Sequence, residues 1–152
     1  MLFITYKTIN HEKTAATESK GNQPPLKVVL IPNKSLAKRG LSIAEVVFKA
    51  MYKALKIGGI LGVVEHRAMA GSEQDPKAIS GYVTEVHVIK LAQQAGFELL
   101  DKSEINANRK DNTQHPKGVW TLPPALRLKE QDKEKYLAIG ESDRMTLTFI
   151  KR

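Results

Sequence analysis

The sequence contains no cysteine, few aromatic residues (6%) and none of the common phosphate-binding glycine motifs. Without cysteine there is no disulfide framework, no thiolate nucleophile and no cysteine-ligated zinc. The four histidines are scattered, and none stands in an H-x-x-x-H or H-E-x-x-H spacing, so the sequence predicts no metal site. Neither G-x-x-x-x-G-K-[ST] nor G-x-G-x-x-G is present.

Long hydrophobic runs are also missing. A bilayer-spanning helix needs about 20 consecutive apolar residues, and no such run occurs. The N-terminal stretch MLFITYKTINHEK begins with apolar residues, but it has no basic segment before them and no small-residue cleavage site. We therefore expect a soluble, cytoplasmic protein with no membrane partner.

The net charge of +8 raises the possibility of a nucleic-acid partner. Residues 1–41 hold seven Lys and Arg against two Asp and Glu, residues 42–106 seven against eight, and residues 107–152 ten against six. A protein that binds the phosphate backbone gathers basic residues on one face, often with aromatic residues between them. No such cluster occurs, so we expect no nucleic-acid partner, although a basic nucleic-acid-associated protein stays an alternative.

The 152 residues suffice for one domain with a core. Residues 10–25 are polar, lack periodicity and end in Pro-Pro, which is typical of a flexible leader. Residues 26–152 carry the helical and strand patterns. We therefore predict a leader over residues 1–25 and one α/β domain over residues 26–152.

The first half of this domain predicts a strand, a helix and a second strand. LKVVLI, residues 26–31, is a short β-branched apolar run. Ser42 and Glu45 form a capping box before an amphipathic helix, which Gly58-Gly59 ends. Residues 60–64, ILGVV, are apolar throughout, as in a parallel strand that is buried on both faces. The three elements predict a right-handed βαβ unit.

The second half predicts further elements in order: a helix capped by Thr84 and ended by Gly96, a strand over 97–105, a long polar loop over 106–126, a helix over 129–140 and a strand over 145–149. The predicted fold class is thus α/β: a partial Rossmann-like sheet, mostly parallel, with an antiparallel C-terminal strand.

Three ionisable residues, Glu65, His66 and Arg67, follow the apolar strand. Parallel strands of α/β proteins bring their carboxyl ends to the edge where ligands bind. A histidine there can act as a general base, and an arginine can hold an anion. The alternative is that polar residues only mark where the strand reaches solvent. Trp120 can likewise stack on a ligand or pack as a lid, and His115 is expected at the surface.

Several stretches resemble class I S-adenosylmethionine-dependent methyltransferases. LKIGG, residues 55–59, is similar to the L-K-P-G-G turn of that family, with Ile57 in place of proline. GGILGVVEHRA, GYVTEVHVIKLAQQAGFELLDKSEINAN, HPKGVWTLPPALRL and YLAIGESDRMTLTF resemble a bacterial branch of predicted methyltransferases. The resemblance runs from about Ser42 to Arg152.

The resemblance implies methyl transfer from S-adenosylmethionine to an unidentified small molecule. His66 is then the catalytic candidate, and Glu65, Arg67 and Trp120 are the substrate-binding candidates, with cofactor-binding residues unknown. The chain resembles only the C-terminal half of the family, so the glycine-rich loop and the acidic ribose-binding residue of the first half are missing. We therefore expect cofactor binding to be impaired.

Two further expectations follow. A non-catalytic remnant or binding module is the alternative function. An isolated half-sheet would also expose an apolar strand edge, so self-association is expected.

Overall fold

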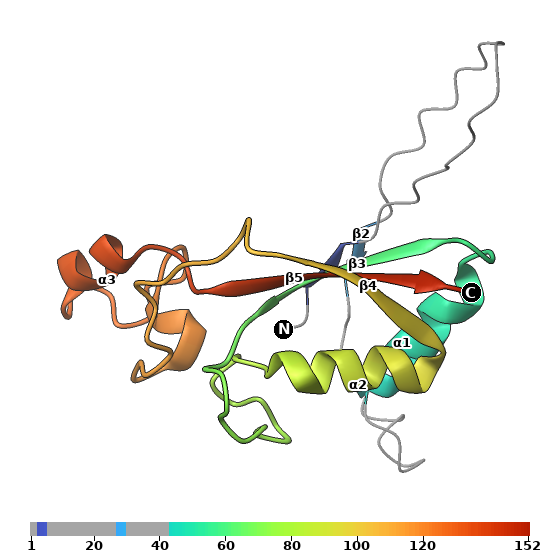
Figure 1. Ribbon diagram of the computed structural model, residues 1–152. Coiled ribbons are helices and arrows are strands. Elements are labelled where there is room, and N and C mark those ends of the chain that lie inside the picture. The colour runs from blue at the N-terminus through green and yellow to red at the C-terminus, as the bar shows by residue number, and fades with distance from the viewer. Residues whose placement is uncertain (1–2, 6–26, 30–42) are drawn as a thin grey trace, which may run out of the picture.

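A computed structural model describes residues 3–5, 27–29 and 43–152 of the chain. Its elements in chain order are β1 (Phe3–Thr5), β2 (Lys27–Val29), α1 (Ile43–Ala54), β3 (Ile60–His66), α2 (Glu85–Ala95), β4 (Phe97–Ser103), the 3₁₀ helix η2 (Gly118–Thr121), α3 (Lys133–Ile139) and β5 (Arg144–Lys151) (Figure 1).

The main sheet has three strands in the order β3-β5-β4. The C-terminal strand β5 lies in the centre and pairs antiparallel with both neighbours. Because β3 and β4 are each antiparallel to β5, they run in the same direction but are not neighbours. A second, separate sheet consists of β1 and β2, also antiparallel.

The predicted mostly parallel, Rossmann-like sheet is therefore wrong. All strand pairs in the described part of the chain are antiparallel. The βαβ unit is also wrong, because the strand expected at residues 26–31 appears as β2 and pairs with β1, not with β3. The prediction followed the order of the strands along the chain, whereas the last strand inserts between two earlier ones.

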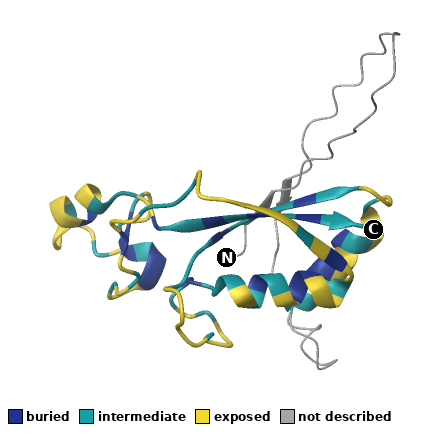
Figure 2. Cartoon of the chain, viewed as in Figure 1, coloured by how far each residue is buried: buried dark blue, intermediate teal, exposed yellow. Residues whose placement is uncertain are grey.

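The core lies between the sheet and two helices. Figure 1 shows α1 and α2 side by side on one face of the sheet, and Figure 2 shows the buried positions where these layers meet. The buried cluster comprises Val47, Phe48, Met51, Leu61, Val63, Val88, Leu91, Ala92, Phe97, Met145, Leu147 and Phe149. Since alternate residues of β3 and β5 are buried, one face of the sheet packs on the helices and the other does not.

The ends of α2 follow the sequence prediction. Thr84 caps the helix by accepting a hydrogen bond from the His87 backbone N–H, and Gly96 ends it in a left-handed conformation with φ of 108°. The predicted capping residue of α1, Ser42, lies outside the described residues. β1 falls within the predicted leader, whose remaining residues also lie outside them.

The segments that do not belong to the sheet gather beyond the carboxyl end of β3. In Figure 1 the loop over 68–80 and the segment with α3 lie at this end, at the left of the view. An isolated parallel bridge joins Arg67 to Val83, so the chain after β3 is held where the strand ends. No helix within the described ranges is long and apolar enough to cross a membrane.

Candidate functional site

The carboxyl end of β3 places three predicted site residues close together but not in equivalent surroundings. Strand alternation puts Glu65 on the helix-covered face with Val63, and His66 on the opposite face. Glu65 is only 3% exposed, whereas His66 and Arg67 are half-buried. The partial exposure of His66 and Arg67 agrees with the position of a strand tip.

Glu65 is a buried carboxyl group with one unused oxygen. Its Oε1 accepts a hydrogen bond of 2.8 Å from the backbone N–H of His66. Its Oε2 has no hydrogen-bond partner within the part of the chain that the structure describes. Burial raises the pKa of Glu65 to about 7, against the opposing effect of the His66 hydrogen bond. Glu65 therefore keeps its proton in mildly acidic solution.

His66 is an uncharged imidazole at neutral pH. Burial, and after it the positive charge of Arg144, lowers the pKa of His66 to about 4. Its Nδ1 lies 2.5 Å from the Oγ of Ser142, a buried residue just before β5. The structure gives the other ring nitrogen, Nε2, no partner among the described side chains. One nitrogen is thus fixed and the other is available.

Arg67 is held by two carboxylates. Its Nε and Nη2 donate to Asp143 at 2.8 and 3.0 Å, and its Nη1 and Nη2 both donate to Glu104 at 2.7 Å. These hydrogen bonds raise the pKa of Arg67, with Glu104 contributing most. The guanidinium joins the ends of β3, β4 and β5, so an external anion would have to displace one of these carboxylates.

Asp111 forms a polar cluster that the sequence analysis missed. Its carboxylate accepts four hydrogen bonds, each of 2.8 Å, from the Tyr82 hydroxyl, the backbone N–H groups of Thr113 and Asp143, and the His115 Nε2. The side chain of His115 is only 4% exposed, so its predicted surface position is wrong. The D-x-x-x-H spacing from Asp111 to His115 was the available signal, but in a loop that spacing does not imply contact.

Trp120 lies in η2 and is half-buried. The guanidinium of Arg127 lies 4.8 Å from its ring centroid, and the ring also borders Gly81. No hydrogen bond or ring contact within residues 43–152 joins Trp120 to Glu65, His66 or Arg67. The structure thus brings the three strand-tip residues together but does not link Trp120 to them.

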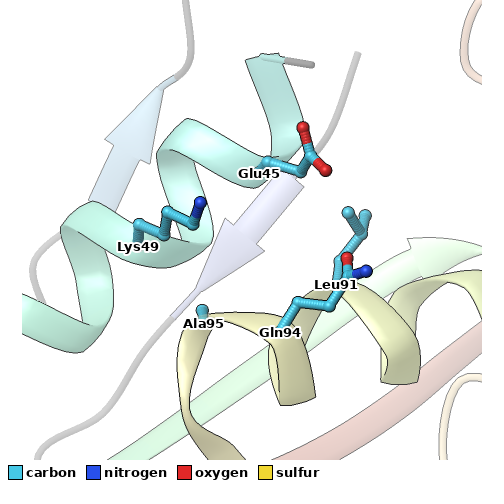
Figure 3. Close-up of a pocket in the computed structure, with 5 residues that line it drawn as sticks. All are labelled: Glu45, Lys49, Leu91, Gln94 and Ala95. Atoms are coloured by element: carbon cyan, nitrogen blue, oxygen red, sulfur yellow. The ribbon is translucent and has the colours of Figure 1, made fainter. Parts of the chain in front are cut away.

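A pocket lies elsewhere, between α1 and α2. It has a volume of about 250 Å³ and is lined by Glu45, Lys49, Leu91, Gln94 and Ala95 (Figure 3). Glu45 and Lys49 come from α1, and the other three residues come from α2 (Figure 3). Because these residues sit on the helices and not at the strand tip, this pocket does not belong to the candidate site.

The described residues do not fit a metal or a glycine-lined cofactor cradle. No group of three or more His, Asp and Glu side chains within them could hold a metal ion. A Cβ added to Gly81, Gly96 or Gly118 would meet Val119, Tyr52 or Ser80, at 2.5, 2.8 and 1.9 Å. Protein atoms therefore fill the space beside these three glycines, which leaves no room there for S-adenosylmethionine to approach the backbone.

Comparisons with known proteins give little similarity. No family model matches the sequence, and no curated protein matches it at a significant level. One similar solved structure is the [4+2]-cyclase SpnF, with 18% sequence identity and a TM-score of 0.39. The match covers 70% of this chain and 43% of that chain, so this chain spans less than half of that structure. A likeness this distant carries no argument about activity.

Proposed function

We propose that the chain is methyltransferase-like and forms the side of a methyl-transfer site that holds a small-molecule acceptor. S-adenosylmethionine is the methyl donor that the sequence resemblance implies. The observation that carries the proposal is the state of His66, an uncharged and partly exposed imidazole at the carboxyl end of β3. We assign it the role of facing the acceptor.

The chemistry of methyl acceptors supports this role. A hydroxyl or amine that gains a methyl group loses a proton, and a neutral imidazole can accept that proton. With its pKa lowered to about 4, His66 is unprotonated at neutral pH. Ser142 holds Nδ1 and leaves Nε2 available. If Nδ1 carries the hydrogen, Nε2 presents its lone pair to the acceptor.

The test is an NMR titration of the 152-residue chain with a panel of small hydroxyl- and amine-bearing compounds. We expect at least one compound to shift the imidazole C–H signals of His66 saturably, and His66→Gln to abolish binding. His87→Gln is the matched control, since His87 is a half-buried histidine on α2. Compounds that shift only Lys49 and Gln94, or that shift nothing, would argue against an acceptor site at His66.

Binding of the cofactor is a separate question. The sequence has no glycine-rich phosphate-binding motif, and Gly81, Gly96 and Gly118 lie against other protein atoms. We therefore expect S-adenosylmethionine at millimolar concentration to give weak binding or none in calorimetry of this chain. A micromolar Kd would contradict this expectation and would show that other residues of the chain bind the cofactor.

The non-catalytic alternative also has a specific observation in its favour. Arg67 donates four hydrogen bonds to Glu104 and Asp143, and Glu65 is buried. Two of the three strand-tip residues therefore serve the fold. If the tip is only structural, no compound will bind at His66, and His66→Gln will change stability alone.

A further inference from the structure

Two arginines flank the tip of β3 and use their guanidinium groups differently. Arg67 uses four of its five N–H groups, because its Nε and Nη2 donate to Asp143 while its Nη1 and Nη2 donate to Glu104. The sequence suggests Arg67 as the residue that holds an anion, but these two carboxylates already occupy it.

In Arg144, by contrast, only one of the two nitrogens on the Nε–Nη2 side of the guanidinium has a hydrogen-bond partner among the described residues. Arg144 begins β5 and lies directly opposite His66 across the antiparallel pair, so the two side chains project from the same face of the sheet. Its Nη2 pairs with Glu141, whereas its Nε is buried and without a hydrogen-bond partner in the described part of the chain. The Nε–Nη2 edge of an arginine matches the two oxygens of a carboxylate.

We propose that Arg144, together with His66 and Ser142, binds a small ligand through a carboxylate group that occupies the Nε–Nη2 edge. Glu141 then acts as an internal competitor for the same edge. Its side chain is 55% exposed and that of Arg144 is 35% exposed, so Glu141 can turn into solvent and open the edge. This proposal does not depend on methyl transfer.

His66 and Ser142 complete the site. The Ser142 hydroxyl can donate to or accept from Nδ1 of His66. When the serine donates, His66 carries its hydrogen on Nε2 and can donate it to a ligand oxygen. Arg144 lowers the pKa of His66, while Asp111 and Glu141 raise it. A carboxylate on Arg144 would offset the arginine charge, so binding should raise the pKa of His66 and strengthen as the pH falls.

The test uses sodium acetate as the probe, at constant ionic strength maintained with sodium chloride. NMR would follow the Nε–H signal of Arg144 and the imidazole C–H signals of His66 in the full chain. We expect both signals to shift saturably with one Kd, and the pKa of His66 to rise in saturating acetate. Arg144→Lys keeps the charge but removes the edge, so we expect about tenfold weaker binding.

Glu141 supplies the matched comparison. The variant Glu141→Gln removes the charge that competes with acetate for Arg144. Because Glu141 is an exposed ion-pair partner, we expect the variant to bind acetate up to about fivefold more tightly. Glu130→Gln should leave the Kd unchanged, because Glu130 forms an equivalent i,i+3 pair with Lys133 elsewhere. The proposal fails if Arg144→Lys binds acetate like the parent chain, or if Glu141→Gln and Glu130→Gln behave alike. If acetate binds but none of the hydroxyl- and amine-bearing compounds shifts the His66 signals, only the proposed methyl-transfer role is contradicted.

Discussion

At the scale of residues, Glu65 and His66 are adjacent in sequence, and burial shifts their pKa values in opposite directions. The pKa of Glu65 rises from 4.5 to about 7, so between these values the folded state keeps a proton that the unfolded state releases. Stability therefore falls as the pH rises through this window. The pKa of His66 falls from 6.5 to about 4, so here the unfolded state binds the extra proton and stability falls as the pH drops.

These opposite dependences predict opposite effects of two substitutions. Relative to the parent chain, Glu65→Gln should gain stability between pH 4.5 and 7, by up to about 3 kcal/mol. His66→Gln should gain stability as the pH falls from 6.5 to 4, by less than this, because His66 is partly exposed. Urea melts from pH 4 to 8 measure both. Parallel profiles for the two variants would contradict the opposite shifts.

Asp111 is the residue whose loss should matter most for the loop after β4. Its side chain is fully buried, and its carboxylate accepts four hydrogen bonds. Asp111→Asn replaces an acceptor oxygen with a donor and leaves buried partners unpaired, at a cost of about 2–3 kcal/mol. Urea melts should show this, while Asp101→Asn, at an exposed position of β4, should stay within about 0.5 kcal/mol. Equal stability of the two variants would show that the hydrogen bonds of Asp111 do not stabilise the fold.

At the scale of elements, the alternation of β3 separates core residues from the strand tip. Val63 is fully buried on the helix-covered face, and Val64 is half-buried on the other. Val63→Ala should lower the free energy of unfolding by about 2 kcal/mol through lost burial and a cavity. Val64→Ala and His66→Ala should each lower it by about 1 kcal/mol or less near neutral pH. Urea melts decide this, and a His66→Ala loss equal to that of Val63→Ala would mark His66 as a core residue.

The connection between the loop over 68–80 and η2 depends on the close approach of Gly118 to Ser80. Gly118 has φ of 55°, and a Cβ there would lie 1.9 Å from the Ser80 carbonyl oxygen. Gly71 has φ of 78° but no atom within 4 Å of such a Cβ. Gly71→Ala should therefore cost about 1–2 kcal/mol from backbone strain alone. Gly118→Ala should cost more in thermal or urea melts, and similar losses would show that the loop moves to make room.

Across the molecule, α1 and α2 cover one face of the main sheet, and β3 and β4 are its outer strands. β4 carries charged residues such as Glu98 and Lys102, which discourage pairing with other chains, whereas Ile60–Val64 of β3 is uncharged. β1 lies close to β3 but is not hydrogen-bonded to it. The edge of β3 is therefore the part of the sheet most suited to pairing with another chain.

We predict concentration-dependent self-association in light scattering, through the edge of β3. Val64→Lys should reduce it by placing a charge on that strand. Thr148→Lys should not, because Thr148 lies on the central strand β5. A monomer at all concentrations would indicate that the β3 edge is protected. Equal effects of the two substitutions would point to contact between sheet faces instead of edges.

Helices and strands with local sequence signals could be predicted from the sequence. Thr84 and Gly96 bound α2 as predicted, and the apolar run before Glu65 forms β3, because caps and strand propensity act over a few neighbouring residues. The position of Glu65, His66 and Arg67 at a strand end was predictable for the same reason. The sheet order could not be predicted in this way, because the insertion of β5 between β3 and β4 depends on contacts between distant segments.

The roles of the site residues also depend on contacts between distant segments. Arg67 is engaged because Glu104 and Asp143 come from the ends of other strands, and Arg144 lies opposite His66 only because β5 pairs with β3. The pKa shifts of Glu65 and His66 arise mainly from burial, which no local pattern measures. The sequence predicted which residue types lie at the strand tip. Their protonation and hydrogen bonding could not be predicted, because both depend on which distant groups surround them in the fold.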